Sequence, residues 1–210
     1  MCWNENISLN TFIFTSFVIL FILYNNTYTQ YKLSEFNNYA LYFFLLSLTT
    51  MQLVEYYLWI SIRQNDPVLN RMSSILGWIL IRIVQPLATI LLIPYTTLRN
   101  LSFFYFLVLG IVYFFKEKPV NFKTTVDKDG HLKWLWLYGY ETVSVLYILI
   151  VFTLFLSNPI LLLISIPLLI YSYIRYDSWG SVWCSSCNII LLYYLIKLLF
   201  ILPYHEYNLC

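Results

Sequence analysis

The chain has 210 residues, of which 60% are hydrophobic and only 10% are charged, and its net charge is +2. A soluble domain carries about 25% charged residues, so this sequence cannot cover a surface that faces water. The small net charge gives no reason to expect a nucleic acid or an acidic protein as partner. The partner that the composition predicts is the lipid bilayer, and the oligomeric state is left open.

Seven apolar segments follow one another and predict an all-α, polytopic integral membrane protein with about seven transmembrane helices in a single domain (1–210). Their approximate bounds are 9–24, 39–60, 72–93, 101–115, 140–156, 160–174 and 181–202. About 20 apolar residues span a bilayer, so the second, third and seventh segments are long enough, whereas the others need flanking residues or a thinner bilayer. The fifth and sixth are either two spans or one re-entrant hairpin. Glu5 but no Lys or Arg precedes the first segment, which favours a retained signal anchor over a cleaved signal peptide.

The distribution of basic residues predicts the orientation. In the seven-span arrangement, the loops on one side contain eight Lys and Arg residues, while the other side has only Lys32 and Arg99. The eight are Arg63, Arg71, Lys116, Lys118, Lys123, Lys128, Lys133 and Arg175. Basic residues concentrate in cytoplasmic loops, so we expect the N-terminus to be cytoplasmic and the C-terminus to lie on the opposite side.

The longest loop, 116–139, is then cytoplasmic and has two interpretations. The Asp129-Gly130 pair is a turn signal, and the stretches 124–126 and 132–136 alternate well enough to form two short strands. A small hairpin would place its Trp residues against the membrane interface. The other interpretation is an irregular basic loop.

A carboxylate in the second segment is the strongest candidate for a functional group. Gln52, Glu55 and Trp59 are spaced i, i+3 and i+7, so they lie on one face of a helix. A charged residue at the bilayer centre costs about 2.5–3.5 kcal/mol on insertion scales, so it requires a partner, a proton or water.

The third and seventh segments also contain polar residues at helical spacing. In the third they are Trp78, Arg82, Gln85 and Thr89, and in the seventh Ser181, Cys184, Ser185 and Asn188. An Arg side chain can bend toward the interface, so Glu55 and Arg82 could meet. The sequence therefore predicts a buried polar layer containing Glu55, Arg82 and Asn188. The layer either fixes how three helices pack or forms a cavity that is open to water.

Few residues suit a metal or a cofactor, and we expect neither. The chain has two histidines, His131 and His205, and the Cys184-x-x-Cys187 pair has apolar, helical flanks. A zinc site needs a second pair of ligands, so these cysteines are interpreted as small packing residues.

Three short motifs resemble a known group of proteins. They are Gln52-x-x-Glu55-Tyr-x-Leu-Trp59, Gln85-Pro-Leu87 and Gly180-Ser-x-Trp183-Cys184-x-x-x-Asn188. Together they resemble uncharacterised small multi-pass membrane proteins of giant nucleocytoplasmic DNA viruses and some protists. The sequence has Ser185 where that group would have a second aromatic residue. The resemblance implies a viral or protist membrane protein, but it implies no substrate.

The leading hypothesis is a small transporter, channel or ligand-binding membrane protein that handles a small ion or solute. In it Glu55 is the ionisable gate or proton acceptor and Arg82 its counter-charge, while Gln52, Gln85 and Asn188 line the path. The second hypothesis is a structural viral or host-membrane protein without flux. The third, an enzyme that modifies lipids near His131 and Glu141, is the weakest, so an enzyme is not expected.

Overall fold

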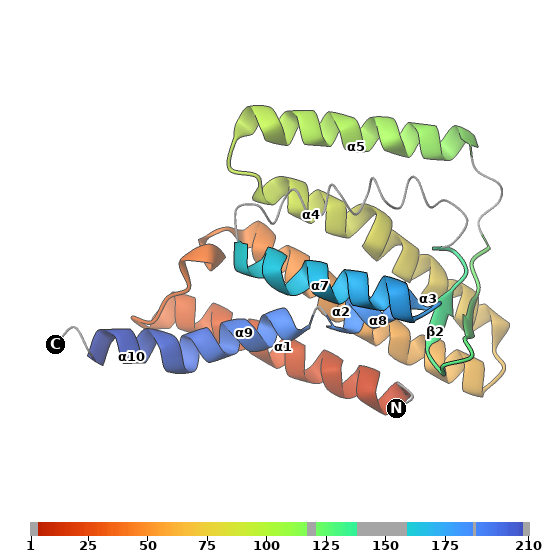
Figure 1. The fold of residues 1–210 in the computed structure, drawn as a ribbon, viewed down its shortest axis with the longest axis horizontal. Helices are drawn as coiled ribbons and strands as arrows, with labels where there is room; N and C mark the ends of the chain where they lie inside the picture. The colour runs from red at the N-terminus through yellow and green to blue at the C-terminus, as the bar shows by residue number, and fades with distance from the viewer. Residues whose placement is uncertain (1–3, 117–120, 138–158, 187, 208–210) are drawn as a thin grey trace.

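The computed structural model describes residues 4–116, 121–137, 159–186 and 188–207, and it is largely helical (Figure 1). The first half contains α1 (Glu5–Tyr28), η1 (Ser34–Asn37), α2 (Tyr39–Arg63), α3 (Pro67–Ile79), η2 (Leu80–Val84), α4 (Gln85–Leu92) and α5 (Thr96–Lys116). The second half contains β1 (Thr124–Val126), β2 (Leu132–Trp134), α7 (Pro159–Arg175), α8 (Trp179–Ser186), α9 (Ile189–Ile196), η4 (Lys197–Ile201) and α10 (Leu202–Tyr207).

Four helical stretches are long and apolar enough to cross a membrane: Glu5–Tyr28, Tyr39–Arg63, Pro67–Leu92 and Trp179–Tyr204. They correspond to the first, second, third and seventh predicted segments and support a membrane protein. Thr96–Val112 and Leu163–Arg175 are apolar but shorter. The fifth predicted segment, 140–156, lies outside the described residues, so the number of seven spans stays a prediction.

Side-chain caps fix where the first three long helices begin. Asn4 Oδ1 accepts a hydrogen bond from the backbone of Ile7 at the start of α1, and Asn38 does the same for Ala40 in α2. Asp66 caps α3 through two backbone N–H groups, and Pro67 follows at the first helical position. Each cap satisfies N–H groups that a helix start leaves without an intrahelical partner, so these boundaries are encoded locally.

Two π-helical turns interrupt the third and seventh segments, and a proline explains both. At η2 the backbone N–H of Gln85 bonds to the carbonyl of Leu80, and Pro86 follows. At η4 the N–H of Leu202 bonds to the carbonyl of Lys197, and Pro203 follows. Because proline has no N–H, the carbonyl four residues before it loses its donor, and the preceding turn widens.

The hairpin interpretation of the long loop is confirmed, but the expected position of its tryptophans is wrong. Strands β1 and β2 pair antiparallel, with Thr124 opposite Trp134, and Gly130 adopts a φ of 80° in the turn. Trp134 and Trp136 are each 1% exposed and stack with ring centroids 5.0 Å apart. They lie in the protein interior instead of at its surface because the hairpin folds back onto the helices.

The hairpin docks on the end of the bundle where α2 meets α3. Asn70 of α3 bonds to both backbone groups of Thr124, at 2.9 and 3.1 Å, and Asn70 Nδ2 also donates to Ser61 of α2. Lys128 in the hairpin turn pairs with Asp177 between α7 and α8. The start of α1 is at this end too, because Glu5 pairs with Arg63. The segments predicted to be cytoplasmic thus share one end, while the face of the membrane that they occupy stays a prediction.

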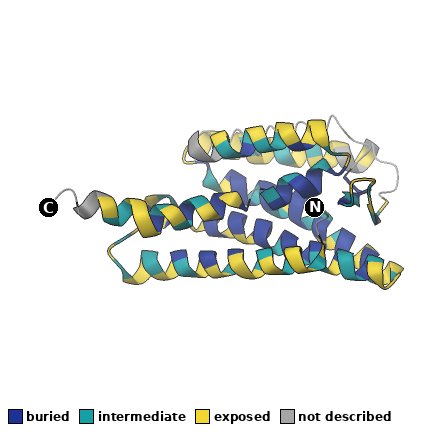
Figure 2. Ribbon diagram, turned by 60° about the horizontal axis from the view of Figure 1, so that its bottom comes forward, coloured by how far each residue is buried: buried dark blue, intermediate teal, exposed yellow. Residues whose placement is uncertain are grey.

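Buried residues gather on the helices at the centre of the bundle, and exposed residues line the outer ones (Figure 2). Helix α2 is the most enclosed of the four candidate spans, since 56% of the residues in its apolar 18-residue stretch are buried inside the protein. It packs against α1 on one side and against α3 and α4 on another. A polar side chain in the middle of α2 is therefore enclosed by protein.

Candidate functional site

The buried carboxylate of Glu55 is the centre of the candidate site. It lies in α2 and is 2% exposed. Ser181 Oγ donates a hydrogen bond of 2.7 Å to Glu55 Oε1, and Ser185 Oγ donates one of 3.3 Å to Oε2. The two serines are four residues apart in α8, so one face of that short helix supplies both donors.

Gln52 extends this arrangement by one turn of α2. Its side chain is fully buried, and its Nε2 lies 3.5 Å from Ser185 Oγ. Within the described part of the chain, its Oε1 accepts no hydrogen bond. We refer to Gln52, Glu55, Ser181 and Ser185 as the serine–glutamate cluster.

Asn188 lies where the last segment changes from α8 to α9. Its Nδ2 donates to the backbone carbonyls of Cys184 and Ser185, at 3.3 and 3.1 Å, and so caps the end of α8. Its Oδ1 is buried and, among the described residues, has no hydrogen-bond partner. Cys184 is itself a buried thiol outside any disulfide.

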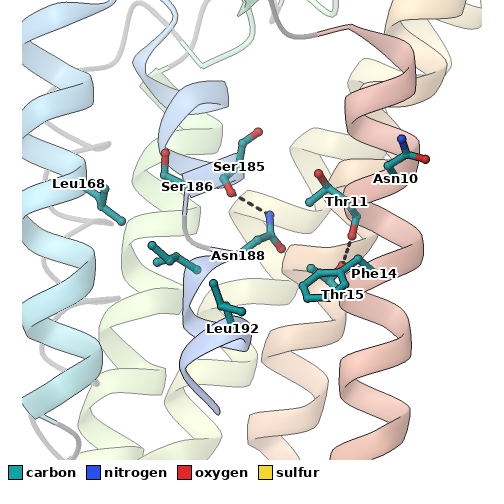
Figure 3. Close-up of a pocket in the computed structure, with 10 residues that line it drawn as sticks. Asn10, Thr11, Phe14, Thr15, Leu168, Ser185, Ser186, Asn188 and Leu192 are labelled. Carbon is teal, nitrogen blue, oxygen red and sulfur yellow. Dashed lines mark hydrogen bonds between the residues drawn. The ribbon is translucent and has the colours of Figure 1, made fainter. Parts of the chain in front are cut away.

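A groove with a volume of about 520 Å³ reaches the cluster from the side of α1. Ser185 and Asn188 form its inner wall, and Figure 3 shows the Asn188 side chain between the end of α8 and the face of α1. The groove is lined by Asn10, Thr11, Phe14, Thr15, Leu168, Ser185, Ser186, Asn188, Ile189 and Leu192. Sequence reasoning missed the contribution of α1, although Thr11 and Thr15 are polar and spaced i, i+4 in an apolar segment.

The predicted pairing of Glu55 with Arg82 is not what the structure shows. Among the described residues, the ion pairs join Arg63 to Glu5, Lys128 to Asp177 and Lys197 to Glu35. Arg82 is buried within the π-turn η2. The prediction assumed a regular helix through the third segment, whereas a π-turn rotates the residues on either side relative to each other.

The other predicted site residues lie outside the serine–glutamate cluster. Gln85 is buried at the start of α4, while Trp59 and Trp78 are half-buried. The Trp78 ring packs edge-on against Phe122, with centroids 6.0 Å apart. Within the described residues, the second and seventh segments therefore meet at Glu55 through hydrogen bonds, and the third contributes none to that carboxylate.

The enzyme hypothesis involves His131 and Glu141, and the structure describes only His131, which lies in the hairpin. His131 is 5% exposed, and its ring packs edge-on against Tyr176 at 5.0 Å. Burial lowers the pKa of His131 below its ordinary value of 6.5. Burial would raise the pKa of Asp127, but nearby Ser178 and the backbone N–H groups of His131 and Asp129 hold it below its ordinary value. Glu141, the other candidate, lies outside the described residues, and the described part of the chain holds no group of three or more His, Cys, Asp or Glu side chains that could bind a metal ion.

These features define a class of protein: a helical membrane protein with a carboxylate buried between two of its long apolar segments. No protein-family model, curated protein or solved structure matches the chain.

Proposed function

We propose that the protein is a small transporter, channel or ligand-binding membrane protein in which Glu55 is the ionisable group. The observation that supports this most directly is a carboxylate, 2% exposed inside a long apolar helix, held by two uncharged hydroxyls. Ionisable residues within membrane spans are expensive to bury and typically mark ion or proton pathways.

The groove supplies a route to this carboxylate. Ser185 lies on the wall of the groove and also donates to Glu55 Oε2. A small ion or solute that enters beside α1 would meet Asn188 and Ser185 first, with Glu55 and Gln52 behind them. In this proposal Glu55 accepts the proton or cation, and the amide and hydroxyl groups line the path.

The test is ion and proton flux in proteoliposomes, with unmutated protein compared with Glu55→Gln. This substitution removes the negative charge while keeping the size and one acceptor oxygen. Glu5→Gln is the matched control, because Glu5 is a carboxylate at the end of the bundle that pairs with Arg63. We expect Glu55→Gln to abolish flux and Glu5→Gln to retain it. Equal flux in all three proteins would contradict the proposal.

A structural role is the second candidate, and one observation favours it. The bonds from Ser181 and Ser185 to Glu55 join two helices that are far apart in the sequence, so the cluster also holds the bundle together. Under this reading, folded protein gives no flux under any gradient, and Glu55→Gln lowers stability alone.

The cellular setting is a further part of the proposal. The resemblance supports a viral or protist membrane, and the distribution of Lys and Arg supports a cytoplasmic N-terminus. Protease accessibility of tags at the two ends of the chain, in sealed vesicles, tests the orientation.

A further inference from the structure

Two buried side-chain amides contact Ser185, and the oxygen of each lacks a hydrogen-bond donor among the described residues. Gln52 contacts the Ser185 hydroxyl through Nε2 at 3.5 Å, and Asn188 contacts the Ser185 carbonyl through Nδ2 at 3.1 Å. In both side chains the nitrogen is used, and the oxygen has no hydrogen-bond partner among the described residues. Buried polar atoms are almost always satisfied, so two unsatisfied acceptors near one serine indicate a place for a hydrogen-bond donor or a cation.

The end of α8 adds to the negative potential at this point. The carbonyls of Cys184 and Ser185, in the last turn of α8, both face the Asn188 side chain, which donates to them through Nδ2. The C-terminal end of a helix carries partial negative charge, which favours a cation nearby.

The charge of the cluster selects the class of cation. In its ionised form Glu55 provides one negative charge, and the described Lys and Arg residues form no ion pair with it. The remaining candidates are neutral oxygen atoms from Gln52, Ser181, Ser185 and Asn188. Calcium sites usually combine several carboxylates, whereas the described residues contain no group of three or more His, Cys, Asp or Glu side chains that could hold a metal ion.

We propose that Glu55, Gln52, Ser181, Ser185 and Asn188 form a binding site for a monovalent cation, with Na⁺ as the probe. The cation neutralises the carboxylate and supplies the positive partner that the two amide oxygens lack. The groove beside α1 gives access, because Ser185 and Asn188 line it. This inference deepens the proposed function and rests on it, since it names the ion that the path handles.

The experiment measures saturable binding of radioactive Na⁺ to purified full-length protein in nanodiscs, with choline replacing Na⁺ at constant ionic strength. We expect Glu55→Gln to weaken binding by at least about tenfold, the smaller of the losses seen when groups that support a metal site are removed. Gln52→Leu and Ser185→Ala are expected to weaken it severalfold. Ser172→Ala is the matched control, because this buried hydroxyl bonds to the carbonyl of Leu168 within its own helix, α7, and is not among the residues that line the groove.

Thermal unfolding of each variant separates loss of the site from loss of the fold. If Glu55→Gln does not fold, Gln52→Leu and Ser185→Ala decide the outcome. Absence of saturable binding by folded unmutated protein, or equal binding by all folded variants, overturns the inference. Flux that depends on Glu55 but needs no Na⁺ would leave the proposed function standing without the cation site. Specific Na⁺ binding without flux would leave the site standing and refute the transport role.

Discussion

The hydrogen bond between Glu55 and Ser181 can be tested by a double-mutant cycle. Ser181→Ala removes the donor of the 2.7 Å bond and leaves Glu55 Oε1 buried without it. Glu55→Leu removes the carboxylate that accepts this bond, so a further Ser181→Ala substitution has no bond left to break. If the two groups interact as the structure shows, Ser181→Ala should cost stability in the unmutated protein and much less in the Glu55→Leu protein.

The expected coupling energy follows from the chemistry of the bond. Hydrogen bonds to charged groups in proteins are worth about 1.5–3 kcal/mol. Interhelical hydrogen bonds in membrane proteins average about 0.6 kcal/mol and reach about 1.7 kcal/mol, because the unfolded chain in the membrane also finds partners. Since this bond is short and its acceptor is 2% exposed, we expect the upper part of that membrane range, about 1–1.7 kcal/mol.

The second cycle, Glu55→Leu with Arg82→Met, is the comparison. Because the described structure gives Glu55 two serine partners and no ion pair with Arg82, these two substitutions should add to within about 0.5 kcal/mol. The assay is unfolding by SDS in mixed micelles, followed by tryptophan fluorescence. A coupling energy near zero for the Ser181 cycle, or a larger one for the Arg82 cycle, would refute the arrangement of the cluster.

Two further predictions concern the surroundings of the site. Gly77→Ala should be less stable than Gly110→Ala by about 1–3 kcal/mol in the same unfolding assay, because both gain helix propensity but only the first overpacks a core. A Cβ at Gly77 would lie 3.2 Å from Trp136, whereas one at Gly110 meets nothing within 4 Å. Stability should also fall as the pH drops below about 6.5, since burial lowers the pKa of His131 and the unfolded chain then binds the proton more readily. His131→Phe, which keeps the ring but cannot titrate, should flatten that dependence between about pH 7.5 and 5.5.

Several parts of the architecture were predictable because they depend on local chemistry. Apolar segments of sufficient length predicted the helices, and the Asp129-Gly130 pair predicted the turn of a hairpin. The polar faces with Gln52 and Glu55 in one segment and Ser181 and Ser185 in another were also visible from helical spacing. These features need only the composition and the period of a helix.

The choice of partner for Glu55 could not be read from the same pattern. Because opposite charges attract, an arginine in the neighbouring segment is the partner that charge alone predicts for Glu55. In the structure, two serine hydroxyls from α8 instead donate hydrogen bonds to its two carboxylate oxygens. Pro86 is visible in the sequence, but a regular helical wheel does not include the π-turn that precedes it. That turn changes which side chains of the third segment face its neighbours.

Residue order alone shows that the chain is helical, that its segments are apolar enough for a membrane, and that the second and seventh segments have polar faces. The folded structure adds that those two faces meet, that the hairpin tryptophans are buried against the bundle, and that α1 completes a groove beside Ser185 and Asn188. Helical period fixes which residues share a face of one helix, whereas the pairing of faces depends on how whole helices pack.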